Sequence, residues 1–313
     1  MKTGLAFLFV SILGTALFAQ EVDEAIGRWD VKVQGADATY PSWIEIRKSG
    51  YKTLVGTFVG RFGSARPIAE IRKTKDQYEF TIPPQWESRK SDLSFQFHLM
   101  DGELVGSKSD DDGNSVTRTA KPAPTLARES GIAEPEWGEP VEIFNGKNLD
   151  GWKVQMDNVP NGWIVKDGLL FNEKPGNNLV TEKMFDDFKL HAEFRYPEKS
   201  NSGLYLRGRY EVQIEDSFGQ VAECHKIGGV YGFLTPSVNA AKPAGEWQEY
   251  DITLVGRHVT VILNGERVID RQEIPGITGG ALDSDEGKPG PILIQGDHGP
   301  IEFRKLIITP ATS

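Results

Sequence analysis

The sequence predicts an all-β protein with two domains. Short segments alternate apolar and polar residues with a period of two, which is typical of strands with one buried face. Asp-Gly and Asn-Gly pairs separate several of these segments, and such pairs favour tight hairpins. No window shows a convincing helical period. The 313 residues include 34 glycines, which favours turn-dense β structure over helices.

The first residues resemble an export signal. Lys2 precedes an apolar run from Leu5 to Leu17, and Ala19 is the expected last residue before cleavage. We therefore predict a signal peptide over residues 1–19 and export to the periplasm or outside the cell. Cleavage sites usually have a small residue two positions before the last residue of the signal, and Leu17 is larger. The alternative to a cleaved signal is an uncleaved anchor. The run is too short for a good membrane span, and no span is predicted.

Residues 21–120 are predicted to form a small antiparallel domain. Asp101-Gly102 marks one of its hairpins. The pattern favours a meander, either a lipocalin-like barrel or a half-barrel. Trp43 and Trp86 are either sugar platforms or core and rim residues. The expected strands lie around residues 29–33, 54–62, 78–82 and 93–99.

A linker and a second β domain follow. Residues 121–140 contain four prolines, Pro122, Pro124, Pro135 and Pro140, which predicts a semi-extended Pro-rich linker. Residues 141–310 contain evenly spaced strand candidates and the Asn264-Gly265 hairpin signal, while 181–188 is the one place for a short helical turn. Without helices between the strands, a two-sheet sandwich or jelly roll is expected.

Charge and cysteine content narrow the possible partners. The net charge of −10 argues against nucleic acid or an anionic membrane as a partner. With a single cysteine, Cys224, no internal disulfide is expected. Neighbouring strand residues point to opposite faces, so Cys224 and His225 do not predict a metal site. The acidic run at 110–113 lacks calcium-loop spacing. No cofactor is predicted; a structural or catalytic divalent cation stays open, as does the oligomeric state.

The most informative stretch is residues 200–219. It alternates like a strand, but one of its faces is polar. Because alternate side chains of a strand share a side, this stretch predicts a sheet with an apolar layer behind a polar, ligand-holding face. The apolar set is Leu204, Leu206, Val212 and Ile214, and the polar set is Tyr205, Arg207, Glu211, Gln213 and Glu215.

Seven motifs in the second domain carry a family resemblance. In order, they are FNGKNLDGW, WIVKDGLL, SNSGLYLRGRYEVQIEDSFG, GGVYG, WQEYDITLVG, VILNG and GDHGPIEFRKLII. Together they resemble the 3-keto-disaccharide hydrolase family, also called 3-keto-α-glucoside-1,2-lyase / 3-keto-2-hydroxy-glucal hydratase domains, over roughly residues 139–310. The resemblance implies a concanavalin-A-like jelly roll, export in bacteria, and sugar substrates already oxidised at C3. The first domain carries no matching motif.

The implied chemistry needs a base, an oxyanion donor and an acid. A 3-keto sugar has an acidic C2–H; a base removes it, the C1 substituent leaves by β-elimination, and water adds across the enone. The expected activity is therefore a 3-keto-glycoside hydrolase or lyase. The chain departs from the family pattern in two places. An extra Gly296 precedes Asp297 and His298, and Glu215 replaces a usual aliphatic residue.

Each candidate residue has a structural alternative. Glu211 is the expected base, or else an ion-pair partner of Arg207 or Arg209. His298 is the expected acid–base partner, because its pKa lies near working pH, or else it orders a turn. The expected substrate-binding residues are Arg207 at the enolate oxygen, Gln213 and Gln295 at hydroxyls, Tyr205 and Tyr231 at the ring, and Asp216, which otherwise caps a turn.

Two other functions stay open. Glu211 and Glu215 lie about 13 Å apart along an extended strand, too far for the carboxylate pair of a conventional glycosidase. A partner carboxylate from another strand would restore that function. A non-catalytic sugar-binding jelly roll is the other alternative, because a fold does not fix a function.

Overall fold

The computed structural model describes residues 23–312 apart from 36–37, 89, 110–114 and 127–133. The predicted signal peptide and the acidic run at 110–113 lie outside these described residues. The described chain is all-β, as predicted, and the 181–188 segment forms strand ends and bends instead of a helical turn. No helix long and apolar enough to cross a bilayer occurs in the described part of the chain.

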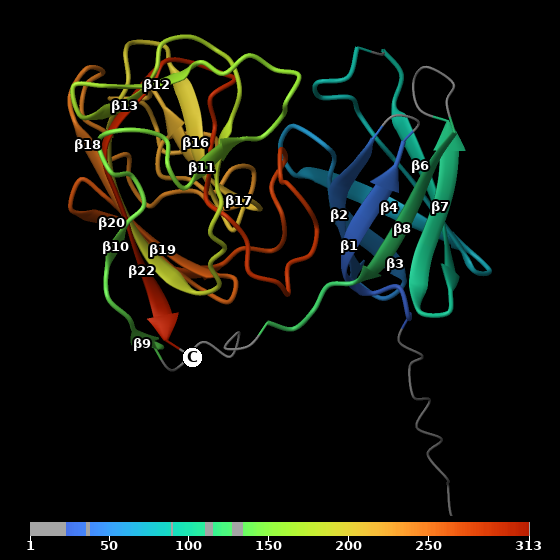
Figure 1. Ribbon diagram of the computed structural model, residues 1–313. Coiled ribbons are helices and arrows are strands. Elements are labelled where there is room, and N and C mark those ends of the chain that lie inside the picture. Colours follow the sequence, from blue (N-terminus) through green and yellow to red (C-terminus); the bar gives the residue numbers. More distant parts are fainter. Residues whose placement is uncertain (1–22, 36–37, 89, 110–114, 127–133, 313) are drawn as a thin grey trace, which may run out of the picture.

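The first domain is a closed antiparallel barrel (Figure 1). Each strand pairs with the next, and β1 also pairs with β8 to close the ring. Apolar residues of alternate positions fill the interior, with Phe58, Phe80 and Phe95 in ring contact. The strands are β1 (Gly27–Gln34), β2 (Thr39–Ser49), β3 (Thr53–Val59), β4 (Arg66–Thr74), β5 (Gln77–Ile82), β6 (Leu93–Met100), β7 (Glu103–Ser109) and β8 (Ser115–Pro122).

The second domain is a jelly-roll sandwich of two antiparallel sheets. The larger sheet has the order β12-β13-β22-β15-β18-β19-β20, with β9 and β10 also paired to β22. It comprises β9 (Glu136–Trp137), β10 (Val141–Glu142), β12 (Trp163–Lys166), β13 (Leu169–Asn172), β15 (Phe188–Arg195), β18 (Gln248–Val255), β19 (His258–Leu263), β20 (Glu266–Glu273) and β22 (Ile301–Thr312).

The smaller sheet carries the polar stretch. Its order is β11-β14-β21-β16-β17, so the two strands of the 200–219 segment lie at one side of it. The inner face packs Leu204, Val212 and Ile214 into the core between the sheets, as predicted. The strands are β11 (Trp152–Val154), β14 (Leu179–Thr181), β16 (Asn201–Leu206), β17 (Tyr210–Glu215) and β21 (Leu293–Ile294).

The two domains share a hydrophobic core. Trp43 of β2 and Val59 of β3 belong to the barrel, but they pack with the core of the sandwich. The Trp43 side chain is fully buried, and a Cβ at Gly276 of the sandwich would lie only 2.2 Å from its ring. Trp43 is therefore a core residue at the domain interface and does not serve as a sugar platform.

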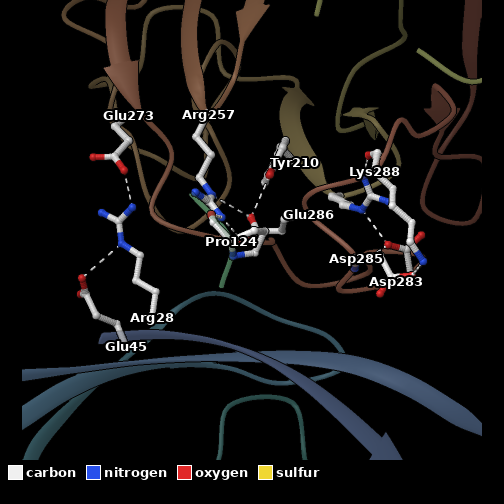
Figure 2. A network of polar contacts seen from close by, with 11 residues as sticks. Arg28, Glu45, Pro124, Tyr210, Arg257, Glu273, Asp283, Asp285, Glu286 and Lys288 are labelled. Carbon is white, nitrogen blue, oxygen red and sulfur yellow. Dashed lines mark hydrogen bonds and ion pairs between the residues drawn. The ribbon is translucent and has the colours of Figure 1, made fainter. Parts of the chain in front are cut away.

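Polar contacts also cross the interface (Figure 2). Arg28 of β1 pairs with Glu273 of β20. Arg257 pairs with Glu286 at 2.9 Å within the sandwich, and it donates to the carbonyl oxygen of Pro124, just after β8, at 3.0 Å. Figure 1 shows barrel and sandwich side by side, with the late loops of the sandwich between them. This docking places the barrel against the polar face of the smaller sheet.

Candidate functional site

A cavity of about 520 Å³ lies between the polar face of the smaller sheet and the barrel. Its size lies within the range of small-molecule sites, about 300–1,000 Å³. Six of the eight predicted site residues line it: Tyr205, Glu211, Gln213, Tyr231, Gln295 and His298. Arg207 and Asp216 do not. The cavity therefore gathers most of the polar residues that the alternation and the motifs pointed to.

Glu211 and Tyr205 form the centre of the site. They are directly opposite each other on β17 and β16, so their side chains share one face. The Tyr205 hydroxyl oxygen lies 3.0 Å from Glu211 Oε2 and 3.0 Å from the carbonyl oxygen of Gly279. A hydroxyl has one hydrogen, so it cannot donate to both. A protonated Glu211 resolves this, because it donates to Tyr205 while Tyr205 donates to Gly279.

The electrostatics agree with that proton arrangement. Burial raises the pKa of Glu211 to about 8; the hydrogen bond of Tyr205 and the charge of His298 oppose the rise, and Asp297 adds to it. Burial also raises the pKa of Tyr205 well above its usual value, so this hydroxyl keeps its proton. Glu211 pairs with neither Arg207 nor Arg209, whose partners are Asp187 and Asp283. A carboxyl with a pKa near neutrality is suited to proton transfer.

His298 and Asp297 form a second titratable unit in the cavity. His298 Nδ1 lies 2.7 Å from Asp297 Oδ1. That hydrogen bond raises the pKa of His298, and the Glu211 carboxylate contributes to the rise. The extra Gly296 fits closely before them, since a Cβ there would lie 2.3 Å from the carbonyl oxygen of Asn177. The insertion is thus accommodated without removing Asp297 and His298 from the cavity.

Amide side chains surround the carboxyl. Gln213 and Gln295 are both buried at the cavity wall. Within the described residues, no donor reaches the Oε1 of Gln295, which is a buried acceptor without a hydrogen bond. Asn178 and Asn201 also line the cavity and were missed by sequence reasoning. Asn201 lies inside the quoted SNSGLYL motif, so a closer reading of that motif was the available signal.

Arg207 is placed differently from the prediction. It belongs to the Arg207-Gly208 turn between β16 and β17, where both residues have positive φ, 53° and 67°. Strand alternation therefore does not set the direction of its side chain. The guanidinium is buried, donates to the carbonyl oxygen of Asp186 at 2.7 Å, and pairs with Asp187 at 2.8 Å. Arg207 ties two loops together and cannot stabilise an enolate oxygen in the cavity.

Other polar residues of the motif have structural partners outside the cavity. Asp216 Oδ2 accepts a hydrogen bond from the Lys199 backbone at 2.8 Å, which matches the turn-capping alternative. Glu215 pairs with Lys226 at 3.2 Å, so it is no carboxylate partner of Glu211. The turn around Cys224 and His225 brings Cys224 Sγ within 3.5 Å of His225 Nδ1, contrary to the expected strand geometry.

The described residues contain one group with metal-ligand chemistry, and it lies away from the cavity. It consists of His191, Glu249 and Asp251 on β15 and β18. His191 Nδ1 is already hydrogen-bonded to Asp251 Oδ1 at 2.8 Å. Neither Cys224 nor His225 belongs to this group.

The fold and the cavity define a jelly-roll protein with a polar cavity over one of its sheets. The family model of the 3-keto-alpha-glucoside-1,2-lyase-like domain matches residues 139–309, more than half of the chain. The chain belongs to this family. The match covers the sandwich and begins after the barrel, and no curated protein matches the chain.

Solved structures resemble the sandwich at moderate levels. A protein from Parabacteroides distasonis, provisionally described as a glycosyl hydrolase, has 28% identity and a TM-score of 0.47 and covers 59% of this chain and 97% of its own. A second such protein of that organism has 26% identity and a TM-score of 0.43, covering 55% and 98%. A carbohydrate-binding module from Bacillus subtilis has 14% identity and a TM-score of 0.37, covering 51% and 95%. The family match carries the assignment.

Proposed function

We propose that this protein is an exported enzyme that cleaves 3-keto-glycosides, such as 3-keto-disaccharides, with Glu211 as the base. Family membership supports a carbohydrate-active hydrolase. The observation that carries the finer proposal is the buried Glu211 carboxyl at the cavity wall, with its pKa raised to about 8. Removal of a carbon-bound proton next to a ketone needs a base of this kind. The same raised carboxyl would serve a two-carboxylate glycosidase as its general acid, so the choice of substrate in the assay separates the two reactions.

The cavity residues provide each step of the reaction. Glu211 takes the C2 proton, and the electron pair forms the C2=C3 bond while the C3 oxygen takes the charge. Tyr231 is suited to donate to that oxygen, because burial and then the Glu211 charge raise the pKa of its hydroxyl and keep it protonated. This hydroxyl takes the role that sequence reasoning gave to Arg207.

Elimination and hydration complete a net hydrolysis. The electrons of the enolate re-form the C3 carbonyl as the C1–O bond breaks, and protonated His298 gives its proton to the departing oxygen. Water then adds at C1 and a proton returns to C2. Gln213 and Gln295 hold ring hydroxyls throughout. The Asp297 contact keeps His298 protonated for the leaving-group step.

The test uses purified protein and 3-keto-maltose. We expect release of free glucose and a transient enone absorbance. Glu211→Gln should lower kcat by about 10³-fold while the far-ultraviolet circular dichroism stays unchanged. Glu215→Gln is the matched control, since Glu215 faces Lys226 outside the cavity. Full activity of Glu211→Gln would remove Glu211 as the base.

The same assay separates the two other functions. Cleavage of unoxidised maltose would support a conventional glycosidase, with Asp297 as the second carboxyl of the cavity lining. Saturable binding without turnover would support a sugar-binding protein.

A further inference from the structure

The barrel supplies one wall of the cavity, although the family match lies wholly in the sandwich. The barrel residues in this wall come from the start of β2 and from the β3–β4 loop: Thr39, Tyr40, Pro41, Arg61, Phe62 and Gly63. Phe62 lines the cavity and is 47% exposed, so part of its surface is open to a ligand. The roles given above to the sandwich residues do not explain why this wall carries aromatic and cationic side chains.

The β3–β4 loop is a built structure and not a loose tip. Gly63 has a φ of +79°, and a Cβ there would lie 2.3 Å from Gln85 Oε1. Gln85 Oε1 in turn accepts a hydrogen bond from the Ser64 backbone at 2.8 Å. The buried ion pair of Arg66 and Glu87, at 3.0 Å, ties the end of the loop at the start of β4 to the same 85–87 segment. These contacts hold Phe62 in place before any ligand binds.

The exposed side chains of the loop form an aromatic and cationic cluster. Phe62 packs edge-to-face on Trp86, with ring centroids 5.5 Å apart. The Arg61 guanidinium lies 5.0 Å from the Phe62 ring and 5.2 Å from the Tyr40 ring. Trp86 is 49% exposed, so this cluster is a rim platform. An exposed aromatic face suits the C–H face of a sugar ring, and guanidinium donors suit its hydroxyls.

The loop is also fixed to the catalytic centre. The carbonyl oxygen of Arg61 accepts a hydrogen bond from the Gly280 backbone at 2.9 Å. Gly279 is the residue whose carbonyl oxygen lies 3.0 Å from the Tyr205 hydroxyl. A ligand that contacts Phe62 therefore lies in the same cavity as Glu211, across the segment 279–280.

We infer that the barrel loop forms a second subsite, in which Phe62 and Arg61 hold the sugar ring that leaves the substrate. This rests on the proposed function, because the leaving ring is defined only by cleavage at C1. A neutral ring is favoured over an anionic one, because the Asp297 carboxyl lines the same cavity and the chain carries a net charge of −10.

The experiment measures binding and not turnover. Calorimetry compares 3-keto-maltose with methyl 3-keto-α-glucoside, which has no second ring, on the full-length Glu211→Gln protein. Adding Phe62→Ala or Arg61→Ala should weaken binding of 3-keto-maltose about fivefold and leave the methyl glycoside unchanged. The matched controls are Tyr51→Ala and Arg72→Ala, exposed barrel side chains outside the cavity lining, which should change neither.

The outcomes separate this inference from the proposed function. Equal weakening of both ligands, no weakening, or no binding of either ligand would overturn the subsite. A ring-dependent loss of binding, together with a wild-type protein that turns over no 3-keto-glycoside, would support the subsite and overturn the catalytic proposal. If Phe62→Ala or Arg61→Ala weakened binding of phenyl 3-keto-glucoside but not of 3-keto-maltose, the subsite would hold an aromatic leaving group and the sugar-ring assignment would be overturned.

Discussion

The carboxyl group of Glu211 lies against the backbone of Gly203 on the neighbouring strand. A Cβ at position 203 would be only 2.4 Å from Glu211 Oε1 and 3.0 Å from its Cγ. Gly203 faces Gln213 in the strand register, diagonal to Glu211, so its missing side chain makes the space that the carboxyl occupies. The orientation of the Glu211 side chain, the proposed base, thus depends on Gly203 of the neighbouring strand.

Gly203→Ala should therefore displace the Glu211 side chain. We expect kcat on 3-keto-maltose to fall more than about tenfold, and the free energy of unfolding to fall by about 1–3 kcal/mol, because a methyl group must enter a packed contact. Steady-state kinetics and denaturant unfolding measure the two effects. Gly265→Ala is the control, since a Cβ there meets no atom within 4 Å, although its positive φ adds some strain of its own. Unchanged kcat would show that Glu211 does not need its present position.

The pH profile reports the ionisation of Glu211. Its pKa is raised to about 8, so below that pH the carboxyl holds a proton and cannot act as a base. The value of kcat/KM should rise about tenfold per pH unit while His298 is protonated, and should level off and then fall once this acid loses its proton and Glu211 is ionised. At pH 7, about one molecule in ten has the ionised carboxylate. A rate that is already constant from pH 5 upward would contradict this role.

Arg207→Met tests the corrected role of this arginine. Its buried guanidinium pairs with Asp187, and removing one partner of a buried pair costs about 3–5 kcal/mol. The folded variant should keep kcat within about twofold of the wild type, a margin that would add less than 0.5 kcal/mol to the barrier. Chemical denaturation measures the loss of stability, and kinetics below the unfolding midpoint measure the kcat of the folded variant. Arg267→Met, at an exposed pair, is the control. A large loss of kcat with normal stability would return Arg207 to the catalytic centre.

Stability should fall as pH rises because of a carboxyl pair at the domain interface. Burial, and then the neighbouring Glu286, raise the pKa of Asp30 of the barrel to about 9. The folded state therefore holds a proton that the unfolded state has lost, so stability is full below about pH 4 for this group and decreases toward pH 9. Glu211 adds a change of the same sign between its usual pKa and about 8.

Asp30→Asn should remove part of this pH dependence. The amide keeps a hydrogen-bonding group without a proton to lose, so the stability of the variant relative to the wild type should increase steadily from about pH 4 to about pH 9, by at most about 1.4 kcal/mol per pH unit. Thermal unfolding across pH 5–9 measures it. Asp76→Asn, at an exposed position, should leave the curve unchanged. A parallel shift at all pH values would show that Asp30 is ionised in the folded protein.

Periodicity predicted the strands and the polar face that the smaller sheet contributes to the cavity. In β16 and β17 the alternation of Leu204 with Tyr205, and of Glu211 with Val212, assigns each side chain to a face, and the structure follows that assignment. It fails at Arg207, because the chain reverses there in a three-residue turn, residues 207–209, in which Arg207 and Gly208 have positive φ. Alternation holds only while the backbone is extended.

What covers the polar face could not be predicted. The pairing of β1 with β8 joins segments far apart in sequence, so closure of the barrel has no local signal. Arg61 and Phe62 enter the cavity through domain docking, which no single strand encodes. The Gly279-Gly280 pair is the one sequence feature that relates to this docking. A Cβ at Gly279 would lie 2.1 Å from the carbonyl oxygen of Gly63 in the barrel, so the contact requires a glycine.

Trp43 carries a consequence for how this protein can be divided. Truncating it to Ala should cost about 3–5 kcal/mol and loosen the sandwich as well as the barrel, whereas Trp86→Ala, at the exposed rim, should cost less than about 0.5 kcal/mol. Intrinsic fluorescence during unfolding measures both, and independent melting of the barrel would contradict the expectation.

Trp43 also constrains how the barrel and the sandwich can be inherited. The family match begins at residue 139, yet the ring that fills the space beside Gly276 comes from position 43. A gene that lost the barrel would leave an open apolar hole in the remaining sandwich, and a gene that exchanged the barrel would need another large ring at the same point. The barrel and the sandwich are therefore expected to be inherited as a pair.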